Sequence, residues 1–572
     1  MANIHKQYPY YNSIPIPNFR ALVEDAATHY GDRVAFGYKI NPRDDSYVEV
    51  SYLQVRDDVR DLGTALLARG YRGKKIGIVS DATYFRTCTY YAVMAVGGVT
   101  VPIDKELSAE EIAAILSTAG CEALFFAAAA QDKVQAILDA APCITQSFTL
   151  NACDKYPDTP SFSSLIAEGR ALVEQGDTSY YDVEQDPDAL ASIVFTSGTT
   201  GKGKGVMLSV RNITQNMEKG YYLFTVPART LYVLPPHHTY GSTILDVGHL
   251  GVGSAMYYSC GLKYILSELK QVKPTHLVLV PLFVETFYKR IWQTAEKQGK
   301  AKLLKRMMKL SNGARKIGID LRKKLFASVL SAFGGELELI ICGGAALNQD
   351  IIDTFDALGV TILNGYGITE CAPLISCNRN RWQKNGSVGL PLIDGEVRIL
   401  DPDENGEGEI AYKGPNVMMG YFGQPEATAA VMTEDGFFKT GDYGKLDEDG
   451  FLYITGRLKN LIIFSNGKNV YPEEIETEIQ RIAGVNEVVV YAGQSKSQPE
   501  AELIVAEIYP DVEGLAEKGI TDLQAYFEEG IKEINKHAVS YKKVHRVKLR
   551  DTEFEKNTSK KIVRFKIDKT VD

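Results

Sequence analysis

Short apolar runs alternate with amphipathic helical patterns along the first third of the chain. "KIGIVS" (75–80) and "VTVPID" (99–104) have the length and β-branched composition of buried strands. "YFRTCTYYAVMAVGG" (84–98) lies between them as a helix, and Ser108 and Glu111 are spaced as the capping box of the next helix. Because strands that alternate with crossover helices pair in parallel, the pattern predicts an α/β fold with doubly wound, mostly parallel sheets.

The pattern of predicted secondary structure changes near residue 390. Strand patterns of the first kind continue up to "VTILNGYG" (360–367). Short strands separated by turns such as "DENG" and "DEDG" then predict a distorted antiparallel β subdomain at about 390–456. Because 572 residues exceed one ordinary core, we expect a large N-terminal domain at 1–458 and a small, mobile α+β C-terminal domain at 459–572.

Composition excludes several classes of protein. The net charge of −9 and the pI near 5.6 argue against nucleic acid as a general partner. The chain begins "MANIHKQYPYYNSIPIPNF", without the basic end and apolar run of a secretory signal, and no stretch has the roughly 20 apolar residues that span a bilayer. The eight cysteines include no CxxC pair and the histidines form no HExxH motif, which argues against disulfides and a structural zinc. We expect a reduced, cytoplasmic protein.

The segment 283–330 is rich in lysine, arginine, leucine and methionine. Its simplest interpretation is a solvated helical surface. Peripheral contact with an anionic surface or a membrane is the alternative.

The stretch "FTSGTTGKGKGVMLS" (195–209) combines glycines, hydroxyl side chains and two lysines. It approaches the P-loop pattern, but Gly205 stands where that pattern requires Ser or Thr for Mg²⁺, and helical character begins only after Ser209. A strand–loop–strand arrangement is therefore favoured over the strand–loop–helix of a P-loop. Glycines let backbone amides approach an anion that hydroxyls and lysine also bind, so a phosphate loop is favoured over an ordinary surface turn.

In its details, "TSGTTGKGKGV" resembles the phosphate loop of the adenylate-forming superfamily, which comprises acyl-CoA synthetases, luciferases and the adenylation domains of peptide synthetases. The family's usual loop has proline where Gly203 stands. Further motifs follow in the family's order and span nearly the whole chain. They are "LPPHHTYG" (234–241), "ICGGAAL" (341–347), "NGYGITE" (364–370), "GEIAYKGPNVMMGY" (408–421), "TGD" (440–442), "GRLKNLI" (456–462), "SNGKNVYPEEIE" (465–476) and "FEKNTSKKIVR" (554–564).

The resemblance implies an ATP site. In this family a carboxylate attacks the α-phosphate of ATP, pyrophosphate leaves, and a reactive acyl-adenylate forms. Tyr366 is implied to pack on adenine, Thr369 to contact the α-phosphate and Glu370 to bind Mg²⁺. The residues implied to hold the β- and γ-phosphates are Thr196, Ser197, Gly198, Thr199, Thr200, Gly201 and Lys204. Further nucleotide-site positions are Gly344, Ala345, Asn364, Gly365 and Gly367.

Two more motifs carry implied roles. Asp442 in "TGD" resembles the carboxylate that accepts both ribose hydroxyls, with Arg457 beside it. His238 in "PPHHTYG" aligns with the family residue that lines the carboxylate site, and His237 is the neighbour with which it could be confused. A Ser–His–Asp triad is a poor alternative because no GxSxG elbow accompanies these histidines.

The C-terminal motifs imply a moving domain. "FEKNTSKKIVR" resembles the loop whose lysine contacts the α-phosphate, a role that falls on Lys561. The family's glycine before this lysine is Lys560 here and its upstream proline is Glu555, so Lys560 remains the alternative. Lys459 matches the hinge about which the small domain rotates after adenylation, and Gly467 would then let the backbone approach the pantetheine arm of coenzyme A.

The region "KPTHLVLVPLFVETFYKRI", the basic segment after it and "LELIICGGAAL" resemble the long-chain fatty acyl-CoA synthetases. This implies a ligase that uses ATP, Mg²⁺ and coenzyme A to convert a medium- or long-chain fatty acid into its thioester, releasing AMP and pyrophosphate. Two alternatives stay open: an adenylating enzyme that loads an acyl carrier protein or another acceptor, and a nucleotide-binding protein without catalysis.

Overall fold

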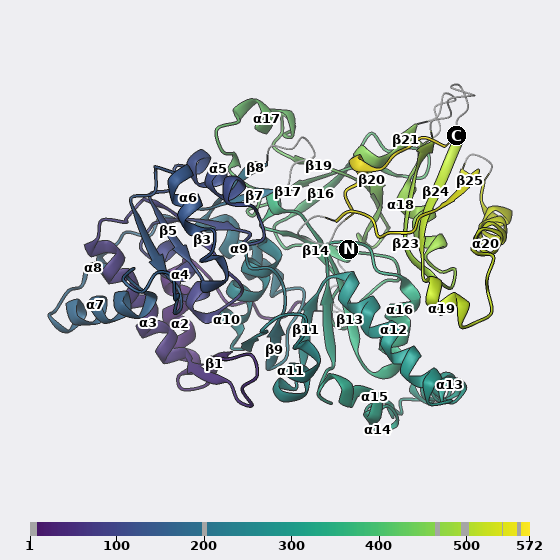
Figure 1. The fold of residues 1–572 in the computed structure, drawn as a ribbon, viewed down its shortest axis with the longest axis horizontal. Coiled ribbons are helices and arrows are strands. Elements are labelled where there is room, and N and C mark those ends of the chain that lie inside the picture. The colour runs from purple at the N-terminus through teal and green to yellow at the C-terminus, as the bar shows by residue number, and fades with distance from the viewer. Residues whose placement is uncertain are drawn as a thin grey trace. The chain divides into compact units, whose positions relative to one another are not determined.

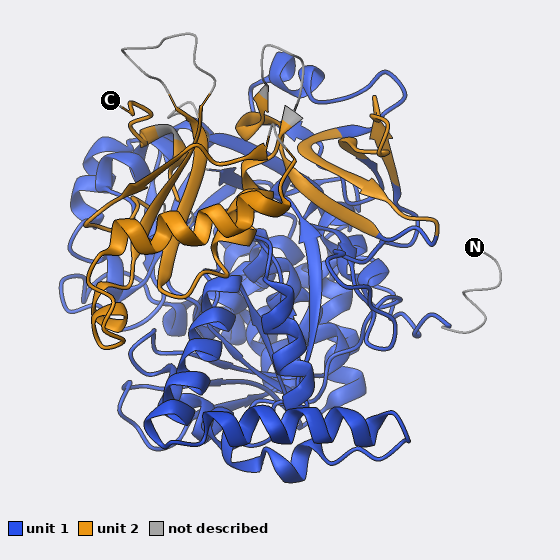
Figure 2. Ribbon diagram, turned by 90° about the vertical axis from the view of Figure 1, so that its right-hand side faces the viewer, with its two compact units in different colours: residues 1–396, 412–438, 449–451 blue, residues 397–411, 439–448, 452–572 orange. Residues whose placement is uncertain are grey.

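The chain forms two compact units, each with its own hydrophobic core (Figure 2). Unit 1 comprises residues 1–396, 412–438 and 449–451, and unit 2 comprises 397–411, 439–448 and 452–572. The computed structural model describes residues 9–196, 203–463, 469–493, 503–539, 542–556 and 562–571. Figure 1 labels the helices and strands.

The first sheet of unit 1 has seven strands. The strands β7, β4, β3, β5 and β6 pair in parallel, while β8 and β18 add an antiparallel edge. Across the sheet the order is β18 (Gly420–Tyr421), β8 (Lys204–Ser209), β7 (Leu190–Thr196), β4 (Val99–Ile103), β3 (Lys75–Val79), β5 (Ala123–Phe126) and β6 (Gln146–Thr149). The predicted parallel crossovers are therefore confirmed, and so is the strand–loop–strand arrangement around the glycine loop.

The second sheet of unit 1 has nine strands and carries most of the predicted site. Its interior pairs are parallel, and its two edges are antiparallel. The order is β15 (Leu390–Pro391), β14 (Leu374–Cys377), β13 (Thr361–Gly367), β12 (Leu339–Cys342), β11 (His276–Leu279), β9 (Arg229–Tyr232), β10 (Ala255–Tyr258), β1 (Val34–Tyr38) and β2 (Val48–Ser51).

The helices of unit 1 cover these sheets. Ser108 and Glu111 form the predicted capping box at the start of α5. The helices are α2 (Phe19–Tyr30), α3 (Tyr52–Ala68), α4 (Tyr84–Ala95), α5 (Ala109–Ala119), α6 (Val134–Ala140), α7 (Phe162–Glu174), α8 (Ser179–Asp182), α9 (Val210–Gly220), α10 (Gly248–Val252), α11 (Ile265–Val272), α12 (Pro281–Lys297), α13 (Ala301–Arg315), α14 (Arg322–Leu325), α15 (Ala327–Leu330), α16 (Gln349–Leu358) and α17 (Pro425–Ala430).

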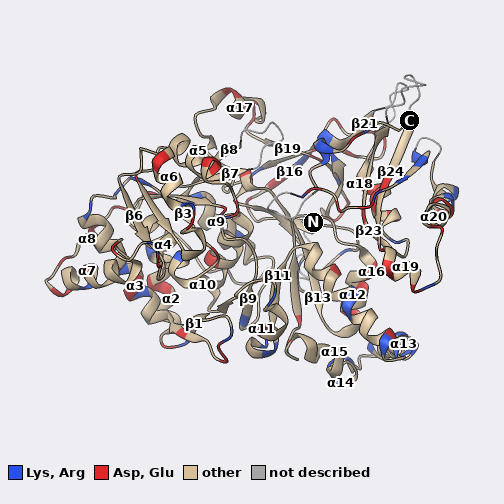
Figure 3. Cartoon of the chain, viewed as in Figure 1, with Lys and Arg blue, Asp and Glu red and all other residues tan. Residues whose placement is uncertain are grey.

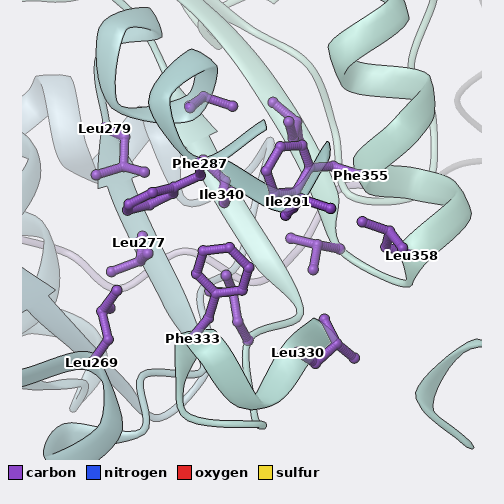
Figure 4. Close-up of a cluster of buried hydrophobic side chains, with 14 of the residues drawn as sticks. Leu269, Leu277, Leu279, Phe287, Ile291, Leu330, Phe333, Ile340, Phe355 and Leu358 are labelled. Atoms are coloured by element: carbon purple, nitrogen blue, oxygen red, sulfur yellow. The ribbon is translucent and has the colours of Figure 1, made fainter. Parts of the chain in front are cut away.

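The largest core described for unit 1 packs helices against the nine-stranded sheet (Figure 4). Leu277 and Ile340 come from strands β11 and β12, and Phe287 and Phe355 come from helices α12 and α16. Apolar side chains recur at helical spacing along α12 and α16, so one face of each helix is buried. This core fixes the strands whose ends form the site described below.

A π-helix at Tyr240–Val247 was not predicted from the sequence. It follows the "PPHH" turn, and every one of its residues except Tyr240 is buried. π-Helical turns are uncommon and are frequent at functional sites. Periodicity could not reveal it, because Ser242, Thr243 and Asp246 interrupt the apolar residues and nearly the whole segment is buried.

Unit 2 holds most of the antiparallel sheet and the C-terminal segment. The four-stranded sheet has the order β16 (Glu396–Leu400), β17 (Gly408–Lys413), β19 (Phe438–Leu446) and β20 (Leu452–Arg457). A second sheet, β23 (Val485–Gly493), β24 (Leu503–Pro510) and β25 (Arg546–Leu549), packs with α18 (Pro472–Ile479) and α20 (Leu523–His537). The short strands β21 (Ile462–Ile463) and β22 (Asn469–Val470) and the helix α19 (Val512–Ala516) complete the unit. Across the described residues, no helix is long and apolar enough to cross a membrane.

Two glycines test how tightly the helices pack. A Cβ at Gly169 in α7 would lie 1.7 Å from the carbonyl oxygen of Asp61 in α3, whereas a Cβ at Gly313 in α13 would meet nothing within 4 Å. Replacing a glycine inside an exposed helix by alanine ordinarily stabilises it by about 0.5–1 kcal/mol. We therefore expect Gly313→Ala to raise the thermal midpoint slightly.

Gly169→Ala should have the opposite sign, because α3 and α7 must separate to admit one methyl group. Thermal unfolding of both variants followed by circular dichroism measures the contrast. Equal thermal midpoints for the two variants would show that α3 and α7 can separate to admit the methyl group without loss of stability.

Candidate active site

The carboxyl ends of parallel strands meet at one edge of the nine-stranded sheet. β11 ends at Leu279, β12 at Cys342 and β13 at Gly367, and β9 ends in the same direction at Tyr232. Open α/β sheets bind ligands at this edge. The strand ends and the segments that follow them carry the predicted residues His238, Gly344, Ala345, Asn364, Gly365, Tyr366, Gly367, Thr369 and Glu370.

A small cavity of about 60 Å³ lies among these strand ends. The predicted residues in its wall are Gly344, Gly365, Tyr366 and Gly367. The other wall residues are mostly apolar: Phe224, Tyr240, Ile244, Ile341, Cys342, Gly343, Pro373, Leu374 and Cys377. A space of this size admits only a few water molecules, and its apolar lining suits an aliphatic group better than a charged one.

Tyr240 is a wall residue that sequence reasoning missed. Its hydroxyl donates to the carbonyl oxygens of Leu279 at 3.1 Å and Ile341 at 3.2 Å, which ties the π-helix to the ends of β11 and β12. Burial raises the pKa of Tyr240, so the phenol stays neutral and remains a donor. Tyr240 lies inside the motif "LPPHHTYG", but nothing in the spacing singled it out. His238, two residues earlier, is half-buried against the ring of His237 and does not belong to the described cavity lining.

A second cavity of about 210 Å³ shares the residues Phe224 and Ile244 with the first. Its other lining residues are Asn12, Met217, Tyr221, Thr225, Val226, Gly248, His249 and Val252. The π-helix residue Ile244 therefore borders both spaces. The first cavity, which begins at Tyr366 and Gly367, is mostly apolar, and the second mixes apolar with polar residues.

Lys204 and Glu370 both contact Tyr421. The Nζ of Lys204 lies 4.4 Å from the centre of the Tyr421 ring, and the Tyr421 hydroxyl donates to Glu370 Oε1 at 2.8 Å. Tyr421 pairs with Val206 next to the glycine loop, which brings the loop's strand β8 near Glu370. Burial, with the Glu370 carboxylate adding to it, raises the pKa of Tyr421. Tyr421 ends a motif noted in the sequence, yet its bridging position needed the β8–β18 pairing to become visible.

Two buried asparagines hold the turn that follows Glu370. The Asn216 side-chain amide donates to the carbonyl oxygens of Cys371 at 3.1 Å and Leu374 at 2.9 Å. The Asn416 amide donates to the same two oxygens at 2.6 and 2.8 Å. The backbone N–H of Met418 donates to the carbonyl of Glu370 at 2.8 Å. Since buried carbonyls need donors, these asparagines fix the backbone beside Glu370.

A buried ion pair supports the loop that carries the two histidines. Arg86 in α4 donates to Asp246 Oδ2 at 2.5 Å and to the carbonyl oxygen of Pro236 at 2.7 Å. Both charged side chains are almost fully buried, at 1% and 0% exposure. Burial raises the pKa of Asp246 to about 6, against the opposing effect of Arg86. Burial, with Arg86 nearby, lowers the pKa of His237 to about 4, so this imidazole is neutral near pH 7.

Gly203, the departure from the family's usual proline, has a local reason. A Cβ at this position would lie 2.7 Å from the carbonyl oxygen of Thr196, the last residue of β7. The chain therefore passes too close to β7 for any side chain. Thr196 also donates through Oγ1 to the carbonyl of Lys204 at 3.4 Å, which closes the base of the loop.

Unit 2 carries the other described candidates. Asp442 in β19 is buried and accepts from Arg457 Nε in β20 at 2.9 Å, and the two residues face each other in the strand register. Arg457 is half-exposed, so its guanidinium holds the carboxylate while part of it faces solvent. Lys459 lies exposed in the short 3-10 turn Leu458–Asn460 that follows β20. The predicted Ser197, Gly198, Thr199, Thr200, Gly201, Gly467 and Lys561, with the alternative Lys560, lie outside the described residues.

Replacing Arg86 should destabilise unit 1 in a pH-dependent way. Arg86→Met leaves the Asp246 carboxylate buried without its partner, a loss typically worth about 3–5 kcal/mol. The folded-state pKa of Asp246 then lies further above its unfolded value, and a raised carboxyl pKa means that stability falls as pH rises from the unfolded pKa toward the folded one. The drop in thermal midpoint should therefore be larger at pH 8 than at pH 5.5.

The double variant Arg86→Met/Asp246→Leu serves as the control, because an apolar pair of similar volume leaves no unpaired charge. It should recover most of the lost midpoint and remove its pH dependence. A single variant as stable as the double at both pH values would contradict the assigned role of Arg86.

The chain is similar in sequence and fold to known acyl-activating ligases. The chain is 28% identical to a chloroplastic long-chain-fatty-acid–[acyl-carrier-protein] ligase of Arabidopsis thaliana, over 84% of this chain and 75% of that protein. It is also 28% identical to long-chain-fatty-acid–CoA ligase 1 of Cavia porcellus, over 83% and 71% of the two chains. The ATP-bound structure of MatB from Rhodopseudomonas palustris matches 96% of this chain and 97% of its own, with a TM-score of 0.75 and 25% identity.

Family profiles match both parts of the sequence. The profile described as AMP-binding enzyme matches residues 23–422, and the one described as AMP-binding enzyme C-terminal domain matches residues 459–570. The first spans the strand ends, both cavities' linings apart from Asn12, and the Lys204–Tyr421–Glu370 contact. The chain therefore belongs to the AMP-binding enzyme family of adenylate-forming, acyl-activating ligases.

Proposed function

We propose that this protein activates a medium- or long-chain fatty acid with ATP and transfers the acyl group to coenzyme A. In the first step a carboxylate oxygen bonds to the α-phosphorus of ATP while the bond to the β-phosphate breaks, so that pyrophosphate leaves. In the second step the sulfur of coenzyme A bonds to the acyl carbon and AMP leaves. The observation that carries the proposal is the apolar cavity that begins beside Tyr366 and Gly367.

The size and lining of the two cavities support an aliphatic acid. Burial of each methylene contributes about 0.8 kcal/mol, so a chain that continues past Phe224 and Ile244 into the larger space gains affinity with length. The mostly apolar lining of the first cavity offers little to a charged or strongly polar acid.

The residues around Glu370 fit Mg²⁺ bound together with ATP. Within the described residues no group of three or more histidine, cysteine or acidic side chains could hold a metal by itself. Mg²⁺ is commonly held by one or two carboxylates together with substrate phosphates and water, which one glutamate at this edge can satisfy. When bound, the ion would neutralise phosphate charge. Glu370 would hold it, Tyr421 would orient Glu370, and Lys204 would face the phosphates.

Roles in the C-terminal part complete the proposal. Asp442, oriented by Arg457, would accept the ribose hydroxyls. Lys561, or its neighbour Lys560, would contact the α-phosphate, and Gly467 would line the path of the thiol. We place the functional boundary at 458/459, with Lys459 as the hinge.

Lys459→Pro should spare pyrophosphate release and block thioester formation, and equal loss of both would exclude a hinge role.

A carrier protein is the second candidate acceptor. One relative at 28% identity is named as an acyl-carrier-protein ligase, whereas others at the same identity are named as CoA ligases. Both acceptors present a thiol at the end of a pantetheine arm, so the adenylation site is compatible with either.

Pyrophosphate release across a series of straight-chain acids tests the function. With ATP and Mg²⁺ we expect slow release with butyrate and rising kcat/KM toward medium and long chains, because each added methylene is buried. Added coenzyme A should accelerate release and give a thioester detectable by mass spectrometry.

Other results of this assay would indicate a different function. Adenylate formation without a CoA thioester, but with acylation of a phosphopantetheinylated carrier protein, would favour the carrier-protein ligase. A preference for aryl or dicarboxylic acids would contradict the assignment of the first cavity to an aliphatic chain. ATP binding without turnover of any acid would indicate a nucleotide-binding protein without catalysis.

Tyr421→Phe should slow adenylation at least about tenfold, since hydrogen bonds to charged groups contribute about 1.5–3 kcal/mol and 1.36 kcal/mol is a factor of ten in rate. The phenyl ring would still face Lys204, so the loss reports on Glu370 alone. Pyrophosphate release at saturating ATP and acid measures it.

The matched control is Tyr181→Phe, which removes a tyrosine–glutamate hydrogen bond of 3.2 Å to Glu24 at the protein surface. It should leave the adenylation rate unchanged. An equally active Tyr421→Phe enzyme would mean that the hydroxyl does not position Glu370.

A further inference from the structure

Residues 297–325 form the most basic stretch of an acidic protein. They contain eleven lysines and arginines but one acidic residue, Asp320, although the whole chain carries a net charge of −9. Figure 3 shows these basic residues along α13 and the segment after it. A local positive field of this kind persists within a Debye length, about 8–10 Å at physiological salt.

The basic face, defined here as the outward side of α13 with residues 316–319, presents cations and aliphatic side chains together. Lys302, Arg306 and Lys309 recur at helical spacing on the side of α13 opposite its buried Leu304 and Ser311. Four large aliphatic residues stand beside these cations in solvent: Leu303 (54% exposed), Leu310 (73%), Ile317 (75%) and Ile319 (48%).

The cations of the basic face do not serve the fold. Within the described part of the chain, no carboxylate pairs with Lys302, Arg306 or Lys309. By contrast, Arg315 and Arg322, which flank the face, both pair with Asp356 of α16 and hold the segment to the core. The structural arginines are therefore distinct from the exposed, unneutralised cations.

The composition of the face distinguishes a lipid surface from a protein partner. Protein interfaces are depleted of lysine and enriched in aromatic residues and arginine, whereas this face is mainly lysine with leucine and isoleucine. Helices that lie in a bilayer interface combine a lysine-rich polar side with aliphatic side chains that reach the acyl region. Long lysine side chains can extend their ammonium groups to lipid phosphates while their stems stay in apolar surroundings.

We propose that the basic face binds the surface of an anionic phospholipid bilayer. Lys302, Arg306 and Lys309 contact lipid headgroup anions, and Leu303, Leu310, Ile317 and Ile319 insert among the headgroups. The attachment is peripheral and reversible, and it needs neither ATP nor an acid substrate. Its failure is therefore distinguishable from failure of the proposed function.

Co-sedimentation with vesicles tests the proposal on the full-length protein. With phosphatidylcholine vesicles that contain 30% phosphatidylserine, we expect binding that pure phosphatidylcholine does not support and that weakens between 0.1 and 0.5 M NaCl. Since each basic residue near such a surface contributes on the order of a fivefold gain, Lys302→Glu/Arg306→Glu/Lys309→Glu should lower the partition coefficient more than about tenfold. Leu303→Ser/Leu310→Ser should lower it as well, and this loss should persist at high salt.

The control variant Lys518→Glu/Lys532→Glu/Lys536→Glu makes the same change in net charge on exposed lysines of unit 2. It should bind vesicles like the unmodified protein. Thermal midpoints and octanoate-dependent pyrophosphate release without vesicles, measured for all variants, show whether each is folded.

Two outcomes would overturn the proposal. Equal loss of vesicle binding in both triple variants would mean that only net charge matters. Absence of vesicle binding together with α13-dependent binding to a purified acidic carrier protein would assign the face to a protein partner.

Discussion

The buried ion pair of Arg86 and Asp246 joins the two sheets of unit 1. Arg86 lies in α4, a crossover helix of the seven-stranded sheet, and Asp246 lies in the π-helix that follows β9 of the nine-stranded sheet. Eleven of the twelve residues of α4 are buried, as expected for a helix enclosed between layers. Since an unpaired charge at this depth is costly, the two sheets can pack only where both partners meet. The remaining features of the site depend on that packing.

Further contacts connect this ion pair to the ends of the strands that carry the site. Arg86 holds Pro236 next to the histidines, and Tyr240 joins the π-helix to β11 and β12. Ile244, one turn further, forms a wall of both cavities. A polar network buried in the protein thus positions residues that line both cavities. Polar groups fix it because their hydrogen bonds are directional, whereas apolar contacts alone tolerate rearrangement.

Much of the fold could be predicted from local patterns, because strand and helix periods are short-range properties. The capping box of Ser108 and Glu111, the parallel crossovers, and the strands on either side of the glycine loop are confirmed. The π-helix and the short antiparallel strands β14 and β15 escaped prediction. The π-helical segment is almost entirely buried and mixes polar with apolar residues, so it has no clear period, and a two-residue strand such as β15 exists only through its partner.

For the site, the sequence determined which chemical groups are available, since residues such as Lys204, Glu370 and Asp442 can be identified from their sequence motifs alone. Only the tertiary structure decided which of them meet. Tyr421 contacts both Lys204 and Glu370 because β18 pairs with β8, and Asn216 reaches the turn after Glu370 across 155 or more residues. Gly203 illustrates the same division. The sequence shows a departure from proline, and the structure supplies the reason, a carbonyl oxygen where a Cβ would stand. Contacts of this kind depend on strand pairing and packing between distant segments, and no local pattern encodes those.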